Sequence, residues 1–386
     1  MNGAATLGRG SNDMRPSFKF ATLGGCAALM ILQGCALHAR RIWTPQPVPA
    51  QRAEIFYATD RTVTNAGEKS CPAGERSTGP AFGLDRDLDG SLRFGRFDIE
   101  VPQNHHLGEL IPYKPLPECT TEASLPIYLN GPQPLASEDF WKSLNDSLQR
   151  ASSKQILVFI HGYNFGFDEA ALWAAQLRAD LKFDGPLILY SWPSHGARLD
   201  YLADEESVAW SAPHLTQFLL ELAARVPGAE IQFLAHSMGN RAIVTALDQI
   251  AVDHCSPPVH LFGQLVFAAP DIDSDVFRQS VPHILPCVEH ATLYVSAKDQ
   301  ALSASARLHQ YPRAGHSEFD LVVLPGMDTV DVTLVDETKY HHDYFLQDRN
   351  VLVDLFQVLR EDLPASQRFG LYHTAEKNDL HWRLQP

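Results

Sequence analysis

Short runs of β-favouring residues, repeated from Gln155 onward, constrain the fold of this chain most strongly. Each apolar run leads into Gly, Ser, Asp or Pro, and helical stretches separate most of them. The runs are QILVFIHGYN, PLILYSWPS, IQFLAHSMG, QLVFAAPDID and ATLYVSAKDQ. Continuous apolar strands that alternate with helices form a parallel sheet with helices on both faces. The sequence therefore predicts an α/β fold with a mostly parallel sheet.

Composition and patterning divide the chain into five parts. They are a signal peptide with a lipobox (1–35), a proline-rich tether (36–52), N-terminal strands with an irregular excursion (53–153), the core (154–363) and a C-terminal tail (364–386). The third part belongs to the same domain as the core, and its runs AEIFYATDR and FGRFDIEVP predict antiparallel strands. Apolar residues at helical spacing predict helices over residues 168–181 and 204–224, and VDVTLVDE predicts a last strand before a helix over 349–360.

The N-terminus has the pattern of an export signal. Arg15 and Lys19 precede a charge-free stretch over residues 20–37, and Met14 is a plausible start. The stretch ends in ILQGCA, which resembles the lipobox of bacterial lipoproteins and would make Cys35 the lipidated first residue. Ala36 after that cysteine favours, by the same resemblance, the outer membrane of the envelope, facing the periplasm. The alternatives are a plain signal peptide or a single membrane anchor.

Four cysteines follow the lipobox, and an exported chain can oxidise them. They are Cys71, Cys119, Cys255 and Cys287. The last two each stand shortly before a predicted strand, so they would lie at the same end of a parallel sheet and could form a disulfide. The first two would then form the second pair. The alternative is four free, buried thiols.

Several classes of function are disfavoured. The net charge of −15 argues against a nucleic-acid surface, because such binding depends on Lys and Arg that neutralise phosphates. The sequence has no phosphate-binding P-loop or dinucleotide motif, so we expect no cofactor. DRDLDGS lacks the final acid of a calcium loop, and the adjacent His341 and His342 have no further ligand cluster, so we expect no metal.

Ser237 stands at a sharp junction between two apolar segments. The residues around it, AHSMGN, match A-x-S-x-G, which differs by one small residue from the nucleophile elbow G-x-S-x-G. That elbow needs small residues because the strand and the helix approach each other closely there. A serine between small residues before a helix can also be an ordinary helix N-cap. The order of the surrounding motifs favours the nucleophile.

The motifs YATDR, VFIHGYN, YSWPS, AHSMGNR, AAPDID and LYVSAKDQAL occur in one order between residues 54 and 363. In this order they resemble the α/β-hydrolase superfamily, and more narrowly an uncharacterised bacterial group within it. The resemblance implies an α/β-hydrolase fold and a serine-hydrolase triad. It implies no particular substrate.

In that superfamily the nucleophile, the acid and the base follow one another along the chain. With Ser237 as nucleophile, Asp299 after the next-to-last strand is the expected acid, and Asp271 and Asp273 are its rivals. The histidine motif of the resembled group falls on His342, which is the expected base; His341 is the alternative, and His316 fits less well.

The resemblance also implies an oxyanion hole built from the backbone N–H groups of Met238 and Tyr163. A further set of residues is expected around the pocket. They are His161, Gly162, Trp192, Ser194 and His236, with Pro193 and Gly196 at its mouth. For the residues of YSWPS the alternative is a tight turn after a strand.

These expectations together describe a lipid-anchored serine hydrolase that cleaves carboxylic esters in the bacterial envelope. Its partners would be an acyl substrate and, through the lipid, the membrane. An amidase or an acyltransferase could use the same triad, and a catalytically silent lipoprotein could use the same fold for binding. The sequence predicts neither the physiological substrate, its acyl-chain length, nor the oligomeric state.

Overall fold

The computed structural model describes residues 51–64, 76–77, 82–102, 104–111, 119–120, 128–195, 200–376 and 379–386. The expected signal peptide, nearly all of the tether, Cys35, Cys71 and Gly196 lie outside the described residues. Among the described residues, no helix is both long enough and apolar enough to cross a lipid bilayer.

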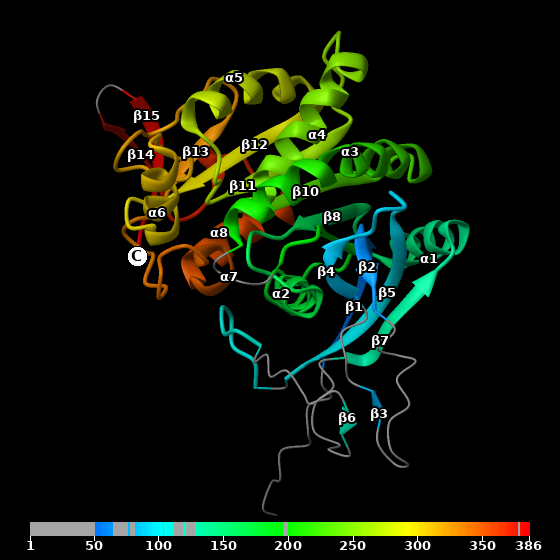
Figure 1. The fold of residues 1–386 in the computed structure, drawn as a ribbon. Coiled ribbons are helices and arrows are strands. Elements are labelled where there is room, and N and C mark those ends of the chain that lie inside the picture. The colour runs from blue at the N-terminus through cyan, green and yellow to red at the C-terminus, as the bar shows by residue number, and fades with distance from the viewer. Residues whose placement is uncertain are drawn as a thin grey trace, which may run out of the picture. The chain divides into compact units, whose positions relative to one another are not determined.

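A sheet of eleven strands organises the described part of the chain (Figure 1). In spatial order the strands are β14 (Leu371–Glu376), β15 (Asp379–Leu384), β13 (Asp328–Asp331), β12 (Val288–Val295), β11 (Phe262–Ala268), β10 (Glu230–His236), β8 (Gln155–Ile160), β9 (Leu187–Ser191), β1 (Gln51–Thr59), β5 (Arg93–Val101) and β7 (Tyr128–Leu135). Neighbours from β15 to β1 are parallel, whereas the pairs β14 with β15, β1 with β5, and β5 with β7 are antiparallel. The predicted fold class, a mostly parallel sheet with N-terminal antiparallel strands, is confirmed.

Two small ladders lie outside the main sheet. One pairs β2 (Arg61–Val63) with β4 (Phe82–Arg86), and the other pairs β3 (Arg76–Ser77) with β6 (Cys119–Thr120). Both belong to the segment that the sequence marks as an irregular excursion. The first ladder begins directly after β1, so Arg61 follows the end of a strand that lies third from one edge of the sheet.

Helices cover both faces of the sheet. They are α1 (Ser137–Arg150), α2 (Phe167–Asp180), α3 (Tyr201–Arg225), α4 (Gly239–His254), α5 (Ser274–Ile284), α6 (Gln300–His309), α7 (Tyr344–Gln347) and α8 (Arg349–Leu359). Figure 1 shows α3, α4 and α5 on one face and α2, α7 and α8 on the other. Strand residues alternate between the two cores: Ile156 and Val158 pack into one, and Leu157 and Phe159 into the other. The helices predicted over 168–181, 204–224 and 349–360 match α2, α3 and α8 within three residues.

The C-terminal end of the sheet differs from the prediction. The strand predicted over VDVTLVDE ends at Asp331, because the side chain of Asp331 accepts hydrogen bonds from the backbone and hydroxyl of Thr333 and turns the chain. Residues 371–384, predicted to be a tail, instead form β14 and β15 and extend the sheet. Trp382 donates to Asp328, and Arg383 pairs with Asp331 at 3.0 Å, so β13 holds this last hairpin.

A disulfide joins Cys255, at the end of α4, to Cys287, directly before β12, with 5.3 Å between their Cα atoms. This confirms the first of the two expected pairs. The second pair cannot be placed, because Cys71 lies outside the described residues. The bond closes a loop with a sequence separation of 32 residues, and that loop contains β11 and α5.

We predict that the double variant Cys255→Ala/Cys287→Ala lowers the free energy of unfolding by about 3.5 kcal/mol. A cross-link over a loop of this length restricts the unfolded chain by that order of magnitude. Urea unfolding followed by circular dichroism measures the difference. The wild type treated with a reductant is the control and should unfold at the midpoint of the double variant; an unchanged midpoint in both would contradict the prediction.

Candidate active site

Ser237 occupies a strained turn between β10 and α4. Its φ is 51°, in the left-handed region that residues other than glycine seldom adopt. The turn is tight, since a Cβ atom at Gly239 would lie 2.3 Å from the carbonyl oxygen of His161. Only glycine fits that position. This is the geometry of a nucleophile elbow, which lifts a serine hydroxyl above the carboxyl ends of the strands.

Hydrogen bonds hold the backbone of this turn. The N–H of Ser237 donates to the carbonyl of Ala268 at 3.0 Å, at the end of the neighbouring strand β11. The carbonyl of Ser237 accepts from the N–H of Asp271 at 3.2 Å and from the side-chain amide of Asn240 at 3.0 Å. The surrounding strands thus stabilise the left-handed conformation.

Asp299 and His342 meet at the same end of the sheet. Asp299 follows β12 and is the N-cap of α6, where one carboxylate oxygen accepts from the N–H of Leu302 at 2.8 Å. Its other oxygen accepts from Nδ1 of His342 at 2.7 Å. Because Nδ1 carries the proton in this bond, Nε2 of His342 can act as a proton acceptor. Asp299 is fully buried, so solvent screens its charge little. The attraction between this carboxylate and the imidazolium of His342 is therefore strong.

Ser237 and His342 line one cavity of about 650 Å³. Within the trio of Ser237, His342 and Asp299, the hydrogen bond found in the described residues is the one between His342 and Asp299. Bonds between a nucleophile and its base commonly tighten only when substrate is bound. The cavity thus brings Ser237 into the same space as the bonded pair of His342 and Asp299.

The carboxylates around His342 change its pKa. Burial lowers the pKa of His342, but the charge and hydrogen bond of Asp299, with the charges of Asp343 and Asp271, raise it to about 9. The imidazolium form is therefore strongly stabilised. Nε2 can accept a proton only when the ring is neutral, so any role of His342 as a base should strengthen as the pH rises toward 9.

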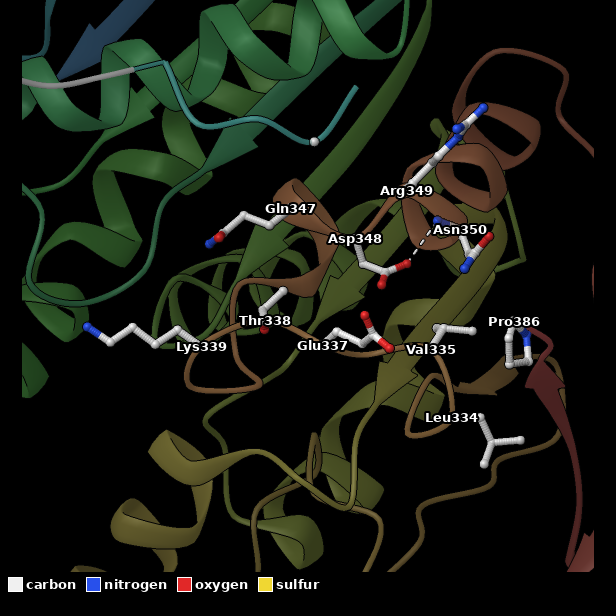
Figure 2. Close-up of a pocket in the computed structure, with 11 residues that line it drawn as sticks. Leu334, Val335, Glu337, Thr338, Lys339, Gln347, Asp348, Arg349, Asn350 and Pro386 are labelled. Carbon is white, nitrogen blue, oxygen red and sulfur yellow. Dashed lines mark hydrogen bonds between the residues drawn. The ribbon is translucent and has the colours of Figure 1, made fainter. Parts of the chain in front are cut away.

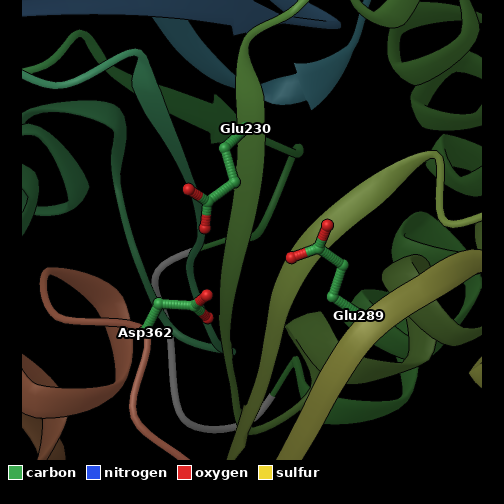
Figure 3. A group of neighbouring side chains, drawn as sticks. All are labelled: Glu230, Glu289 and Asp362. Carbon is green, nitrogen blue, oxygen red and sulfur yellow. The ribbon is translucent and has the colours of Figure 1, made fainter.

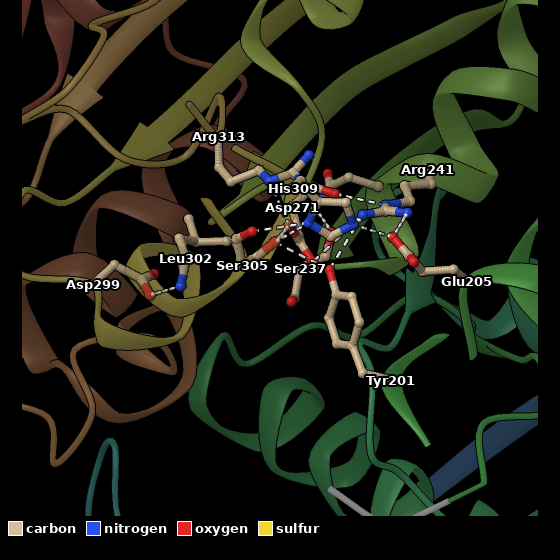
Figure 4. Close-up of polar contacts among 11 residues, drawn as sticks. Tyr201, Glu205, Ser237, Arg241, Asp271, Asp299, Leu302, Ser305, His309 and Arg313 are labelled. Atoms are coloured by element: carbon tan, nitrogen blue, oxygen red, sulfur yellow. Dashed lines mark hydrogen bonds and ion pairs between the residues drawn. The ribbon is translucent and has the colours of Figure 1, made fainter. Parts of the chain in front are cut away.

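The rival acid Asp271 has other partners. Its carboxylate accepts from Ser305 at 2.6 Å and from the hydroxyl of Tyr201, and it lies 3.7 Å from the Arg241 guanidinium and 3.5 Å from that of Arg313. Figure 4 shows this network, with Asp299 lying apart from it. None of the hydrogen bonds or ion pairs of the described residues joins Asp271 to His342.

The remaining rivals are also separate. Asp273 is the N-cap of α5 and accepts from two amides of that helix. Nδ1 of His341 lies 3.4 Å from the carboxylate of Asp336. The backbone of His341 is left-handed, with a φ of 55°, directly before His342. His316 is hydrogen-bonded to Ser303 at 2.8 Å. Of all the predicted acids and bases, the structure brings together Asp299 and His342.

The expected oxyanion donors lie beside the elbow. Met238 stands at the N-terminus of α4, where backbone N–H groups have no intrahelical acceptor and the helix dipole favours negative charge. The loop after β8 approaches from the other side, since a Cβ atom at Gly162 would lie 3.0 Å from the Cβ of Ser237. Tyr163 follows in that loop and lines the cavity.

The expected pocket residues separate into two groups. His236 lines the cavity, and burial lowers its pKa well below the usual value. His161, Trp192 and Ser194 are fully buried and, with Gly162, are not among the residues that line it. They are instead tied to the loop after β8, where Trp192 donates to the carbonyl of His161 and Ser194 accepts from the N–H of Phe165.

Other cavity residues carry no motif that the sequence could reveal. Tyr201 begins α3, Glu169 and Trp173 belong to α2, and Tyr340 precedes the histidine pair. One face of α6 lines the cavity as well, through Ala301, Leu302, Ala304 and Leu308. Periodicity assigns such residues to helices but not to a cavity wall, since the facing element is unknown from sequence.

Two further groups lie outside this cavity. A second hollow of about 480 Å³ lies where residues 334–339 and 347–350 meet the C-terminal Pro386 (Figure 2). Three carboxylates, from Glu230, Glu289 and Asp362, gather where β10 and β12 begin, at the end of the sheet opposite Ser237 (Figure 3). Side-chain amides already donate to Glu230 and Asp362.

Comparisons with known proteins agree with this architecture. The family described as "Alpha/beta hydrolase of unknown function (DUF900)" matches residues 136–361. An uncharacterised protein from Nostoc sp. is 28% identical over 142 residues, which cover 30% of this chain and 37% of that protein. The chain thus spans just over a third of the length of this curated relative.

Solved structures with some similarity include the phospholipase PlaB from Legionella pneumophila, in complex with thio-NAD and in a second structure. They are 14% and 12% identical, with TM-scores of 0.31 and 0.27. The match covers 60% of this chain in both cases, and 67% and 68% of the other chains. Similarity of this size indicates nothing about activity.

We predict that His342 titrates near pH 9 and that Asp299→Asn lowers this pKa toward the ordinary value of about 6.5. Loss of the Asp299 charge destabilises the imidazolium, so the proton leaves at lower pH. Imidazole NMR signals followed from pH 5 to 11 report both values, with His342→Asn to assign the resonance. A wild-type pKa at or below 6.5 would contradict this electrostatic account.

Proposed function

We propose that this chain, which belongs to the α/β-hydrolase family of unknown function DUF900, hydrolyses carboxylic esters through an acyl-enzyme on Ser237. One observation carries the proposal. A serine in a nucleophile elbow and a histidine bonded to a buried carboxylate line the same cavity. Acyl transfer by a serine needs a nucleophile, a base and a group that orients the base, and these three residues are of the required types.

The proposed reaction begins when Nε2 of His342 accepts the proton of Ser237 as Oγ attacks the ester carbonyl carbon. The carbonyl oxygen becomes negative, and the N–H groups of Met238 and Tyr163 stabilise it. The tetrahedral intermediate collapses, His342 returns the proton to the leaving alcohol, and the acyl group stays on Oγ. Water then attacks the acyl carbon while His342 accepts its proton. The bond to Oγ breaks, His342 returns the proton to Ser237, and the carboxylic acid is released. Asp299 holds the imidazole through Nδ1 and stabilises its charged form.

The cavity supports an acyl substrate of moderate size. Its volume of about 650 Å³ falls in the range of sites that enclose small ligands. Ala301, Ala304 and Leu308 give one wall an apolar surface suited to an acyl chain. An amidase or an acyltransferase would use the same residues and differ only in the leaving group or the acceptor, so paired substrates with one acyl group must separate them.

We predict that His342→Asn lowers kcat for p-nitrophenyl butyrate by about 10⁴-fold or more, the usual loss when a triad base is removed. The matched variant His341→Asn should keep at least half of the wild-type rate, because asparagine tolerates the left-handed backbone at that position. Steady-state kinetics on the ester, and on the p-nitroanilide with the same acyl group, measure both effects. Equal losses in the two variants would exclude His342 as the specific base, and faster turnover of the anilide would favour an amidase.

We also propose that lipidation of Cys35 anchors the protein in the bacterial envelope, with the hydrolase domain in the periplasm. The support is the lipobox-like ILQGCA at the end of a charge-free stretch. Two or more acyl chains on one residue suffice for stable anchoring.

We predict that Cys35→Ser abolishes incorporation of an alkyne-labelled palmitate and releases the protein from the membrane fraction. Cys26→Ser, in the same charge-free stretch, is the matched control and should retain both properties. Click labelling of the gel band and membrane fractionation provide the measurements. Palmitate incorporation that persists in Cys35→Ser would rule out this anchor.

A further inference from the structure

A fully buried arginine lies beneath the loop that carries Tyr163. Arg61 has no exposed surface, and only Asp60 separates it from the end of β1. Its Nε donates to the hydroxyl of Ser191 at 2.9 Å, and Nη1 donates to the carbonyl of Ser194 at 3.0 Å. Nη2 donates to the carbonyl of Phe165 at 2.8 Å. The guanidinium thus ties the end of β9 to the loop after β8.

The buried charge is costly to maintain. None of the described residues forms a direct ion pair with Arg61, and the groups that accept its hydrogen bonds there are a hydroxyl and backbone carbonyls, all of them neutral. Burial lowers the pKa of Arg61 to about 10, while the more distant carboxylates of Asp60, Asp204 and Asp168 raise it. The side chain therefore stays charged at neutral pH. A buried charge is unfavourable unless its donors are satisfied, and most of the acceptors that satisfy Arg61 lie at the end of β9 and in the loop after β8.

Two other residues hold the same loop. The hydroxyl of Ser194 accepts from the N–H of Phe165 at 3.1 Å and donates to the carboxylate of Asp204 at 2.5 Å. The same carboxylate oxygen accepts from the N–H of Asn164 at 3.4 Å. We call Arg61, Ser194 and Asp204 the loop clamp. Arg61 binds the carbonyl of Phe165 and Ser194 binds its N–H, while Asp204 binds the N–H of Asn164.

The loop contains a left-handed residue. Asn164, directly after Tyr163, has a φ of 68°, a conformation that asparagine adopts more readily than most residues. The clamp binds the N–H of Asn164 and both backbone groups of Phe165, the two residues that follow Tyr163.

His161 completes the support at the start of the loop. Its Nδ1 donates to the carbonyl of Gly162 at 2.7 Å, so Nε2 is the acceptor that faces Nη2 of Arg61 at 3.4 Å. Burial and the charge of Arg61 lower the pKa of His161 to about 3, so the ring stays neutral. On its other side the loop touches the elbow, through the close approach of Gly162 to Ser237.

We propose that the loop clamp positions the N–H of Tyr163 for the oxyanion of the reaction. This inference rests on the proposed esterase function. It gives a role to two sequence motifs, YATDR and YSWPS, that the cavity lining and the proposed triad do not explain. The clamp residues do not line the cavity, so they are positioning residues and not catalytic ones. Their effect would appear in the transition state more than in substrate binding.

The test compares Arg61→Lys and Ser194→Ala with the wild type. Lysine keeps the charge but cannot reproduce the planar set of donors, and alanine removes one hydroxyl. We expect kcat for p-nitrophenyl butyrate to fall by about 10-fold to 1,000-fold, the loss typical of a misplaced oxyanion donor, while KM changes less than about 3-fold. Affinity for a phenylboronic acid, which forms a tetrahedral adduct with an activated serine, should fall in parallel.

Hydrogen exchange provides a readout that does not depend on turnover. Amides of the peptide spanning residues 161–166 should exchange faster in both variants, while those of α8 remain as in the wild type. Arg278→Lys, an arginine paired with Asp320 outside the cavity, is the matched control and should leave all measurements unchanged.

Two outcomes would overturn the inference. In the first, the variants lose thermal stability but keep wild-type kcat, boronate affinity and loop exchange, which indicates a purely structural role. In the second, KM rises while kcat is unchanged, which indicates an effect on substrate binding. If the wild type hydrolyses no ester, the proposed function fails and so does the oxyanion role, whereas the exchange experiment still decides whether the clamp orders the loop.

Discussion

The close approach of α4 to the end of β8 is the contact on which the whole site depends. It allows the chain to turn at Ser237 with a left-handed backbone, and it brings the first turn of a helix against the loop after β8. Glycine at positions 239 and 162 is the condition for this approach, since a side chain at either would collide with backbone or with the serine itself. The proposed nucleophile and both proposed oxyanion donors follow from one steric arrangement.

The parallel sheet extends this arrangement to distant parts of the sequence. Because β8, β10, β11 and β12 all end at the same edge, Ser237, Asp271 and Asp299 come within one neighbourhood, and His342 reaches it from the segment after β13. The two carboxylates act on the histidine in different ways. Asp299 is hydrogen-bonded to His342, whereas Asp271 raises the pKa of His342 through its charge alone and is itself paired with Arg241 and Arg313. The hydrogen bond gives a physical reason why Asp299 and not Asp271 is suited to assist a base.

The sequence predicts this site well where chemistry is tied to local pattern. Apolar runs that end in small residues identify the strands, and the order of motifs places Ser237, Asp299 and His342 near one another. The sequence predicts the structure less well where contacts between distant segments determine the ends of strands and the edge of the sheet. The strand predicted to begin at Val330 ends early because the side chain of Asp331 accepts a hydrogen bond from the backbone of Thr333. The weakly apolar run DLHWRL joins the sheet because it pairs with the edge of β13. The support beneath the Tyr163 loop could not be foreseen, because Arg61 is 100 residues from His161 and 104 from Phe165 along the chain.

The most direct test of the central claim is the intact mass of the purified mature domain after reaction with a fluorophosphonate, followed by peptide mapping. If the elbow and the Asp299-bonded His342 activate the serine, the protein gains one phosphonyl group, the adduct maps to Ser237, and Ser237→Ala gains none. A folded wild-type protein that gains no adduct, or that carries it on another residue, would contradict the account and favour a hydrolase fold used for binding.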